Sequence, residues 1–404
     1  MAKNTAKLLL LSVVASGIFC VNAVAQSSLG ALPYAGVIMD ASGNLYGTTT
    51  NGGAYGWGTV YELSPTGTET VLYNFTGGSD GGDPYGGLIR DSRGNLYGTT
   101  AYRGEKACAA GPGCGVVYKL TPGNKQTVLY TFTGGSDGGV PLAGLIRDPS
   151  DNFYGTTLGG GNPNCYVSND YSMSGCGVVY RLSPQGIQTT LHIFAGGSDG
   201  AGPYGGVIRD SSGNLYGTTY GGGTYGFGTI FKIDSAGNET ILYNFGALEQ
   251  DGCSPKSGVI RDSVGNLYGT TFSCGAYGNG MVYKLSPTGS LRLLYSFKGA
   301  PDCQWPVAGL IRDPSGNFYG TTEDGGTGNL GCIFKITPSG QETVLQSLTV
   351  PDGGYPYAGL TRDSSGNLYG TTWTLGNENC GYFGGCGTVY KLVGGTTFTV
   401  LSSF

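Results

Sequence analysis

The apolar residues of this chain fall into short segments that are separated by glycine, proline, aspartate and serine. The stretch 84–140 contains four such segments, which cover residues 87–90, 95–100, 116–120 and 127–132. Short segments rich in β-branched and aromatic side chains and bounded by turn residues are typical of β-strands. No stretch after residue 25 shows a helical period of useful length. The pattern therefore predicts an all-β protein.

These four segments form a unit of about 50 residues that recurs seven times along the chain. The first turn of each unit begins with an aspartate, at Asp40, Asp91, Asp148, Asp210, Asp262, Asp313 and Asp363. Its second strand contains Tyr-Gly-Thr-Thr, which begins at Tyr46, Tyr97, Tyr154, Tyr216, Tyr268, Tyr319 and Tyr369. The repeats lie near residues 33–83, 84–140, 141–202, 203–254, 255–305, 306–355 and 356–404.

Seven equal units of four strands predict a seven-bladed β-propeller, with four antiparallel strands per blade and one sequence repeat per blade. Each sheet would bury its two faces against its neighbours. The alternatives are a β-sandwich and a parallel β-helix. A sandwich does not explain seven equal units, and the coils of a β-helix are usually much shorter. Because each repeat starts with a first strand and ends with a fourth, we expect the ring to close without exchanging a strand between the termini.

The unit G-[LV]-I-R-D-x-x-G-N-[LF]-Y-G-T-T, followed by G-T-V-Y-K-L-[ST]-P and T-V-L-Y-x-F, resembles the GloVer tandem repeat. Exported bacterial proteins with this repeat are called choice-of-anchor repeat proteins. The resemblance covers roughly residues 33–404 and implies export and a propeller-like fold. It implies little about activity. Many relatives carry a C-terminal anchor, whereas this chain stops at Phe404, which implies a freely soluble exported protein.

The first 25 residues are typical of a secretory signal peptide. Lys3 and Lys7 precede an apolar run over residues 8–21, and Ala23-Val24-Ala25 offers a cleavage site. We therefore expect one domain over residues 26–404, secreted or periplasmic. No other apolar run approaches the roughly 18–20 residues of a membrane helix. The net charge is −5 and no basic run exists, which argues against nucleic acid as a partner. We expect a monomer.

Ten cysteines follow the signal peptide, and an exported chain with an even number of cysteines is expected to form disulfides. In antiparallel blades, the loops between second and third strands share one end of the propeller with the loops that join one repeat to the next. We call this end the variable face, because it holds nearly all the length variation. The cysteines lie there, and the topology favours the pairs Cys108–Cys114, Cys165–Cys176, Cys253–Cys274, Cys303–Cys332 and Cys380–Cys386. A zinc site on these cysteines is disfavoured, because no CxxC pair exists.

The opposite end, which we call the uniform face, carries the repeated Asp-x-x-Gly-Asn turn. Asp210, Asn214 and Tyr216 have the residue types of an active site, but a set repeated seven times is architecture. Asp151 replaces the turn glycine once, and aspartate also tolerates positive φ. The arginine before the aspartate is expected to form charge pairs between blades or across the turn. The single histidine, His192, is expected to be a strand residue.

Function is expected on the variable face, because variable loops on a rigid scaffold usually carry it. The candidate ligand-binding residues are Tyr55, Trp57, Tyr225, Phe227, Trp305, Trp373 and Tyr382. Aromatic rings beside polar groups suit a polysaccharide or another cell-surface component; packing between blades is the alternative reading.

An enzyme is the second hypothesis. Glu323, Asp324 and Glu378 could act as general acid and base in a hydrolase or lyase. A purely structural envelope protein is the third. No cofactor is expected except possible Ca²⁺ at Asp80 and Asp83, for which Asp-Gly turns are the alternative reading.

Overall fold

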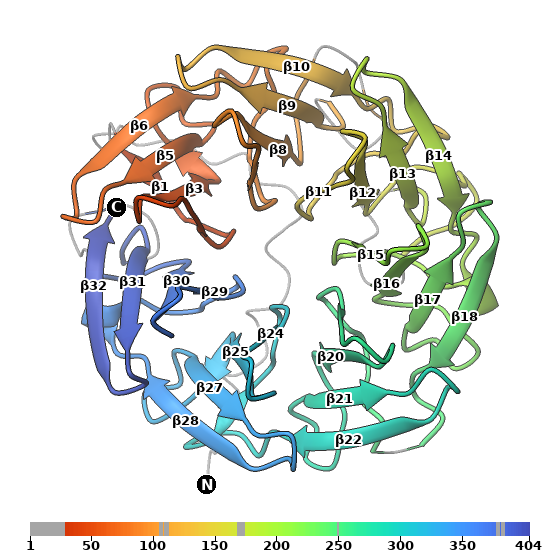
Figure 1. Ribbon diagram of the computed structural model, residues 1–404. Helices are drawn as coiled ribbons and strands as arrows, with labels where there is room; N and C mark the ends of the chain where they lie inside the picture. Colours follow the sequence, from red (N-terminus) through yellow and green to blue (C-terminus); the bar gives the residue numbers. More distant parts are fainter. Residues whose placement is uncertain are drawn as a thin grey trace, which may run out of the picture.

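The computed structural model describes residues 29–104, 108, 113–167, 174–248, 250–376, 380 and 384–404. Seven four-stranded antiparallel sheets surround a central axis as a seven-bladed β-propeller (Figure 1), which confirms the predicted fold. The predicted signal peptide and the candidate residues Glu378 and Tyr382 lie outside the described residues. Within those ranges no helix is long and apolar enough to cross a membrane.

Each blade consists of four consecutive strands from one repeat. Blade 1 contains β2 (Ile38–Met39), β3 (Leu45–Thr49), β5 (Thr59–Leu63) and β6 (Glu69–Asn74). Blade 2 contains β7 (Ile89–Arg90), β8 (Leu96–Thr100), β9 (Val116–Leu120) and β10 (Gln126–Thr131). Blade 3 contains β11 (Ile146–Arg147), β12 (Phe153–Thr157), β13 (Val178–Leu182) and β14 (Gln188–Ile193). Blades 4 and 5 contain β15 (Ile208–Arg209), β16 (Leu215–Thr219), β17 (Thr229–Ile233) and β18 (Glu239–Asn244); and β19 (Ile260–Arg261), β20 (Leu267–Thr271), β21 (Met281–Leu285) and β22 (Leu291–Ser296). Blades 6 and 7 contain β24 (Ile311–Arg312), β25 (Phe318–Thr322), β27 (Cys332–Ile336) and β28 (Glu342–Ser347); and β29 (Thr361–Arg362), β30 (Leu368–Thr372), β31 (Thr388–Val393) and β32 (Thr397–Ser403).

The remaining elements are short and lie in loops. β1 (Gly30–Ala31) pairs with β4 (Asn51–Gly52), and β23 (Cys303–Gln304) pairs with β26 (Asp324–Gly325). Two single-turn 3-10 helices, η1 (Gly197–Asp199) and η2 (Val350–Asp352), follow the fourth strands of blades 3 and 6.

The core lies between blades rather than inside any one of them. The second strand is buried at all five positions in six of the seven blades, for example β16, whereas the fourth strand is only half-buried on the outside of the ring. Phe75, which follows β6, packs edge-on against Tyr118 of the next blade, with ring centroids 5.1 Å apart. A single four-stranded sheet could not exclude water from both of its faces, so the ring is the unit of stability.

The Tyr-Gly-Thr-Thr segment is explained by these contacts. A Cβ on Gly217 would lie 2.5 Å from Phe231 Cζ, so glycine makes room for the ring of the neighbouring strand. The hydroxyl of Thr218 donates to the carbonyl oxygen of Ser257 in the next blade, at 2.6 Å. Equivalent bonds between blades come from Thr99, Thr156, Thr270, Thr321 and Thr371.

The ring closes without strand exchange, as expected. β29 to β32 form the last sheet by themselves, and β32 lies beside the first blade (Figure 1). The hydroxyl of Thr371 donates to Ala35 O at 3.0 Å, and Leu32 N donates to Cys386 O at 2.8 Å. The first and last blades are thus joined by the same kinds of bonds as the others.

The repeated turn has a structural role, as predicted. Asp210 Oδ1 accepts from the N–H groups of Ser212 and Asn214, while Oδ2 accepts from Asn214 Nδ2 and Tyr216 Oη. The same aspartate, asparagine and tyrosine are bonded in all seven blades. Asp151 has a φ of 66°, which confirms that aspartate there takes the place of the turn glycine.

The charge pair predicted for the repeated arginine is present in one blade. Among the described residues, an ion pair across the turn is formed only between Arg147 and Asp151. Four other guanidinium groups, those of Arg90, Arg209, Arg261 and Arg312, lie over tyrosine rings of the preceding blade, as Arg261 does over Tyr216 at 5.6 Å. Because Asp210 and its equivalents already accept four hydrogen bonds from their own turn, a cation–π contact is the interaction left to the arginine.

Candidate functional site

All five predicted disulfides are present at the variable face: Cys108–Cys114, Cys165–Cys176, Cys253–Cys274, Cys303–Cys332 and Cys380–Cys386. Three of them close a single loop between second and third strands. Cys253–Cys274 ties such a loop to the loop that enters the same blade, and Cys303–Cys332 ties the loop that enters blade 6 to the first residue of its third strand. Five disulfides indicate an oxidising, extracellular or periplasmic environment. They also fix the loops that surround the axis of the propeller.

At the variable face, the chain enters every blade through a turn with a strained backbone. Seven residues that directly precede a proline adopt a positive φ of 54–65°: Leu32, Asp83, Val140, Gly202, Ser254, Trp305 and Tyr355. A residue before proline normally adopts extended backbone, and positive φ is unfavourable for residues that carry a Cβ. In each blade the carbonyl of this residue accepts a hydrogen bond from the residue after Thr-Thr, as Trp305 O does from Glu323 N at 3.0 Å. This bond holds the turn.

The residues that follow these prolines point to the axis. Tyr34 stacks on Tyr357, with ring centroids 4.7 Å apart and an angle of 12°, and meets Tyr85 edge-on at 4.9 Å. Burial is the main cause that raises the pKa of Tyr34, and the charges of Glu323 and Tyr204 raise it further. Blades 6, 7, 1 and 2 are neighbours around the ring, whereas Tyr204 belongs to blade 4 and can approach Tyr34 only across the axis. The first strands β11, β15, β24 and β29 lie innermost in Figure 1.

Glu323 lies at the centre of this arrangement. Its Oε1 accepts a hydrogen bond from Tyr357 Oη at 2.9 Å, whereas its Oε2 is buried without a hydrogen-bond partner. Burial raises the pKa of Glu323, and Lys256 and the bond from Tyr357 oppose that shift. Burial also lowers the pKa of Lys256, against the opposing charge of Glu323. The pKa values of this carboxyl group and of the amine that influences it are therefore both shifted toward the neutral forms.

Aromatic rings connect these groups to the two predicted tryptophans. The Lys256 ammonium lies 3.4 Å from the centroid of the Phe272 ring, which in turn lies 5.9 Å from the Trp305 ring. Trp373 meets Tyr357 edge-on at 5.3 Å. We call this group the axial cluster, and it consists of Tyr34, Lys256, Phe272, Trp305, Glu323, Tyr357 and Trp373. All seven residues are half-buried.

The other predicted aromatic residues lie away from the axial cluster, on loop tips of blades 1 and 4. Tyr55 is 58% exposed, Tyr225 51% and Phe227 45%. Trp57 is covered by Arg103, whose guanidinium carbon lies 3.7 Å from the ring centroid. The structure thus brings together Trp305, Trp373 and Glu323 of the predicted set, and leaves the Tyr-Gly-aromatic set apart from them.

The two neighbouring acids of the enzyme hypothesis do not share a partner. Glu323 bonds to Tyr357, whereas Asp324 Oδ1 accepts a long hydrogen bond from Asn329 Nδ2 at 3.5 Å. Burial raises the pKa of Asp324 as well.

The predicted calcium ligands have partners within the protein. Asp80 accepts hydrogen bonds from Tyr73 Oη at 2.9 Å and from Thr76 Oγ1 at 2.5 Å. Burial raises the pKa of Asp83 to about 6, and the charge of Arg103 opposes that shift. Asp80 therefore has the bonds of a turn residue, which was the alternative reading. Calcium binding stays a prediction.

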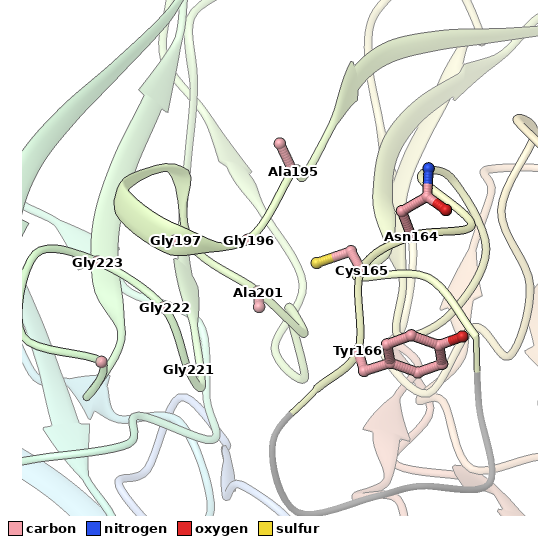
Figure 2. Close-up of a pocket in the computed structure, with 11 residues that line it drawn as sticks. Asn164, Cys165, Tyr166, Ala195, Gly196, Gly197, Ala201, Gly221, Gly222 and Gly223 are labelled. Atoms are coloured by element: carbon pink, nitrogen blue, oxygen red, sulfur yellow. The ribbon is translucent and has the colours of Figure 1, made fainter.

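A hollow lies between blades 3 and 4 on the same face. It has a volume of about 400 Å³ and is lined mainly by glycines (Figure 2): Asn164, Cys165, Tyr166, Ala195, Gly196, Gly197, Ala201, Gly221, Gly222, Gly223 and Gly226. Tyr166 is the single large side chain among them and is 60% exposed. Because most of these residues are glycines, the hollow is lined by backbone atoms and has few side chains that could recognise a specific ligand.

Four residues of the axial cluster were missed by sequence reasoning: Tyr34, Lys256, Phe272 and Tyr357. Phe272 directly follows Thr-Thr, and each of the other three follows the proline that enters a blade, so that position recurs although its residue type varies. Aligning the seven repeats at that proline would have grouped those three. What could not be read from one repeat is that this position faces the axis.

Comparisons with known proteins support the fold and the repeat. A model of the Gloeobacter/Verrucomicrobia repeat family matches residues 13–166 and 164–384. No curated protein matches the chain in sequence. A putative 6-phosphogluconolactonase from Bacteroides uniformis is similar in structure, with a TM-score of 0.54 and 14% identity over 88% of this chain and 94% of that one.

Two further structures are similar over most of this chain but over only part of their own length. Puromycin hydrolase has a TM-score of 0.56 and 12% identity, and the match covers 93% of this chain and 54% of that chain. The extracellular domain of a putative one-component system from B. thetaiotaomicron has a TM-score of 0.54 and 12% identity, with 85% and 38% covered. At such low identity these likenesses show the propeller fold alone.

Proposed function

Since this chain belongs to the Gloeobacter/Verrucomicrobia repeat family, whose description states no activity, we propose its function from the site. The protein is an exported, non-enzymatic scaffold that binds a glycan, or a similar polyhydroxylated surface ligand, at the axial cluster. The five disulfides and the predicted signal peptide support export.

The observation that carries this proposal is the buried Oε2 of Glu323, which has no hydrogen-bond partner. A buried acceptor without a partner costs about 1–3 kcal/mol, so such a group is expected to have a use. A sugar hydroxyl is a donor that would satisfy it. Lys256, which lies near Glu323, can donate to ring or hydroxyl oxygens of the same ligand.

The aromatic rings of the cluster supply the apolar part of such a site. Trp305 lies against Phe272 and Trp373 against Tyr357, and both tryptophans are half-buried. Binding sites for small ligands combine apolar walls with a few polar groups that fix orientation. The disulfide Cys303–Cys332 lies two residues from Trp305, which limits the loss of entropy on binding.

The test is a glycan array, followed by pull-down with the polysaccharides that score. We expect Trp305→Ala, Trp373→Ala and Glu323→Gln each to weaken binding at least 10-fold. Asp324→Asn is the matched control, because its carboxyl group has a different partner. Tyr55→Ala and Tyr225→Ala report on the loop tips. Binding that depends on the loop tips but not on the axial variants would contradict the proposal, as would a lack of any binding.

A hydrolase or lyase is the second candidate function, and one observation favours it. Burial raises the pKa of Glu323, beside an amine whose pKa is lowered, and general acids and bases are tuned in this way. The two functions are distinguished by incubating the bound glycan with the protein. Release of products by the wild type, abolished in Glu323→Gln and retained in Asp324→Asn, would replace the binding proposal with an enzymatic one.

A further inference from the structure

Neighbouring blades meet at their outer edge in a recurring arrangement. Tyr73 of β6 donates from Oη to Asp80 Oδ2 at 2.9 Å, and Gln126 of β10, in the next blade, donates from Nε2 to the Asp80 carbonyl oxygen at 3.3 Å. Tyr130, Asp137 and Gln188 repeat this arrangement between blades 2 and 3. At both junctions the loop aspartate accepts hydrogen bonds from an uncharged side chain of each of the two blades: a tyrosine from its own blade and a glutamine from the next.

The junction between blades 3 and 4 departs from this arrangement on both sides at once. His192 of β14 takes the place of the tyrosine, and Glu239 of β18 takes the place of the glutamine. His192 Nε2 lies 3.1 Å from Asp199 Oδ1 and 3.7 Å from Glu239 Oε2. One ligand atom from each of the three residues lies within 4.8 Å of the others. Two substitutions that are 47 positions apart in the sequence (239 − 192) thus meet at one point.

The resulting junction is rich in ligand atoms and poor in hydrogen-bond donors. Glu239 Oε1 is buried and has no hydrogen-bond partner. The side chains of His192, Asp199 and Glu239 are 18%, 20% and 11% exposed. The edge of the Phe194 ring packs against the imidazole, with centroids 4.8 Å apart. A cation would satisfy two facing carboxylates that the protein itself leaves without enough donors.

We propose that His192, Asp199 and Glu239 bind a divalent transition-metal ion such as Zn²⁺, between blades 3 and 4. Imidazole and carboxylate ligands lie about 2.0–2.2 Å from zinc, so two of them in a tetrahedral shell are about 3.3 Å apart. The separations of 3.1 and 3.7 Å from the imidazole nitrogen lie on either side of that value. Imidazole favours transition metals over Ca²⁺ and Mg²⁺. Three protein ligands leave a fourth position for water.

The surroundings already orient one of these ligands. Asp199 Oδ2 accepts a hydrogen bond from Ala195 N, which leaves Oδ1 for the metal. Bonds of this kind to a ligating carboxylate fix its geometry. Asp199 ends η1, and the preceding residues Gly196 and Gly197 line the hollow between blades 3 and 4 (Figure 2). A metal ion there would hold one wall of that hollow as well as joining two blades.

The junction between blades 5 and 6 provides a comparison within the same molecule. Glu342 and Asp302 meet there as well, but the histidine position is occupied by Tyr295. The sulfur of Cys303 cannot ligate, because it is bonded to Cys332. We therefore expect metal binding at the first junction and not at the second. The difference between them is the imidazole.

The experiment uses the chain without a histidine tag, treated with chelator and then titrated with Zn²⁺ by calorimetry. We expect one equivalent to bind. His192→Tyr and Glu239→Gln should each weaken binding at least 10-fold. Both variants introduce the residue that other blades carry at the same position, so both are expected to fold. Glu342→Gln is the matched control and should bind Zn²⁺ as the wild type does.

A second measurement needs no variant. His192 is the single histidine of the chain, so its imidazole proton resonances report directly on this site. Zn²⁺ should shift them, and Co²⁺ should broaden them and give visible absorption. Absence of saturable Zn²⁺ binding, imidazole resonances that stay unchanged, or equal binding by His192→Tyr would each overturn the proposal.

Discussion

The two ends of the propeller are built from the same seven repeats, yet they differ in what their side chains do. At the uniform face, each aspartate is bonded to its own asparagine and tyrosine, as in Asp210, Asn214 and Tyr216. Glu323 at the variable face and Glu239 at the outer junction between blades 3 and 4 each keep a buried oxygen without a partner. The side chains of the repeated turn are therefore satisfied among themselves, whereas these two carboxyl groups lie where the repeats differ.

The largest effect is expected from a change to the repeated framework. Gly217→Ala would place a Cβ 2.5 Å from Phe231 Cζ, and overpacking of this kind costs about 1–3 kcal/mol of unfolding free energy. Gly87→Ala is the control, because a Cβ there meets nothing within 4 Å. Urea unfolding of both variants measures the difference. Equal stability would show that the glycine is not required by packing.

A smaller, pH-dependent effect is expected where the framework departs from its own pattern. Burial, followed by the charge of Asp302, raises the pKa of Glu342 from 4.5 to about 7, and Lys298 opposes this. The folded state therefore holds the proton more tightly than the unfolded state. The stability linked to that proton is fully present below pH 4.5 and is lost as the pH rises through about 7.

Glu342→Gln removes this dependence and restores the residue of blades 2 and 3. Because Glu342 is only partly buried and its charge is screened by solvent, at pH 8 we expect the variant to be more stable than the wild type by about 0.5–2 kcal/mol, and at pH 4.5 we expect the two to be nearly equal. Thermal unfolding across this range gives the result. A difference that does not grow with pH would show that the carboxyl group does not titrate there.

The smallest effect is expected at the buried tyrosines of the third strands. The hydroxyls of Tyr61, Tyr118, Tyr180, Tyr283 and Tyr390 are buried without a hydrogen-bond partner, whereas blades 4 and 6 carry Phe231 and Phe334 at this position. Tyr118→Phe should therefore leave stability unchanged or raise it by up to about 1 kcal/mol. A clear loss of stability in urea unfolding would reveal a partner for the hydroxyl.

Much of the fold was predictable because the same sequence repeat occurs seven times along the chain. The strand pattern gave the blades, and the order of strands placed all ten cysteines at one end, which was enough to pair them. The arginines were harder. Their position between blades followed from the repeat, but cation–π contact instead of charge pairing depended on Asp210 and its equivalents being saturated by their own turns.

The candidate site was only partly predictable. Trp305, Trp373 and Glu323 stood out because they break the repeat in the variable loops. Lys256 and Tyr34 gave no such signal, since the residue after the entering proline differs from blade to blade. Closure of the ring brings them to Glu323 from blades 5 and 1. His192 and Glu239 likewise looked like ordinary strand residues until neighbouring blades were packed together.

By itself the sequence determined the propeller, its seven blades, its turns and its disulfides, because these depend on contacts within one repeat or between consecutive loops. The tertiary structure decided which side chains share the axis and which meet across a junction between blades. The physical reason is that such neighbours belong to different repeats. Their proximity is set by the radius and closure of the ring, and no local pattern of residues encodes that distance.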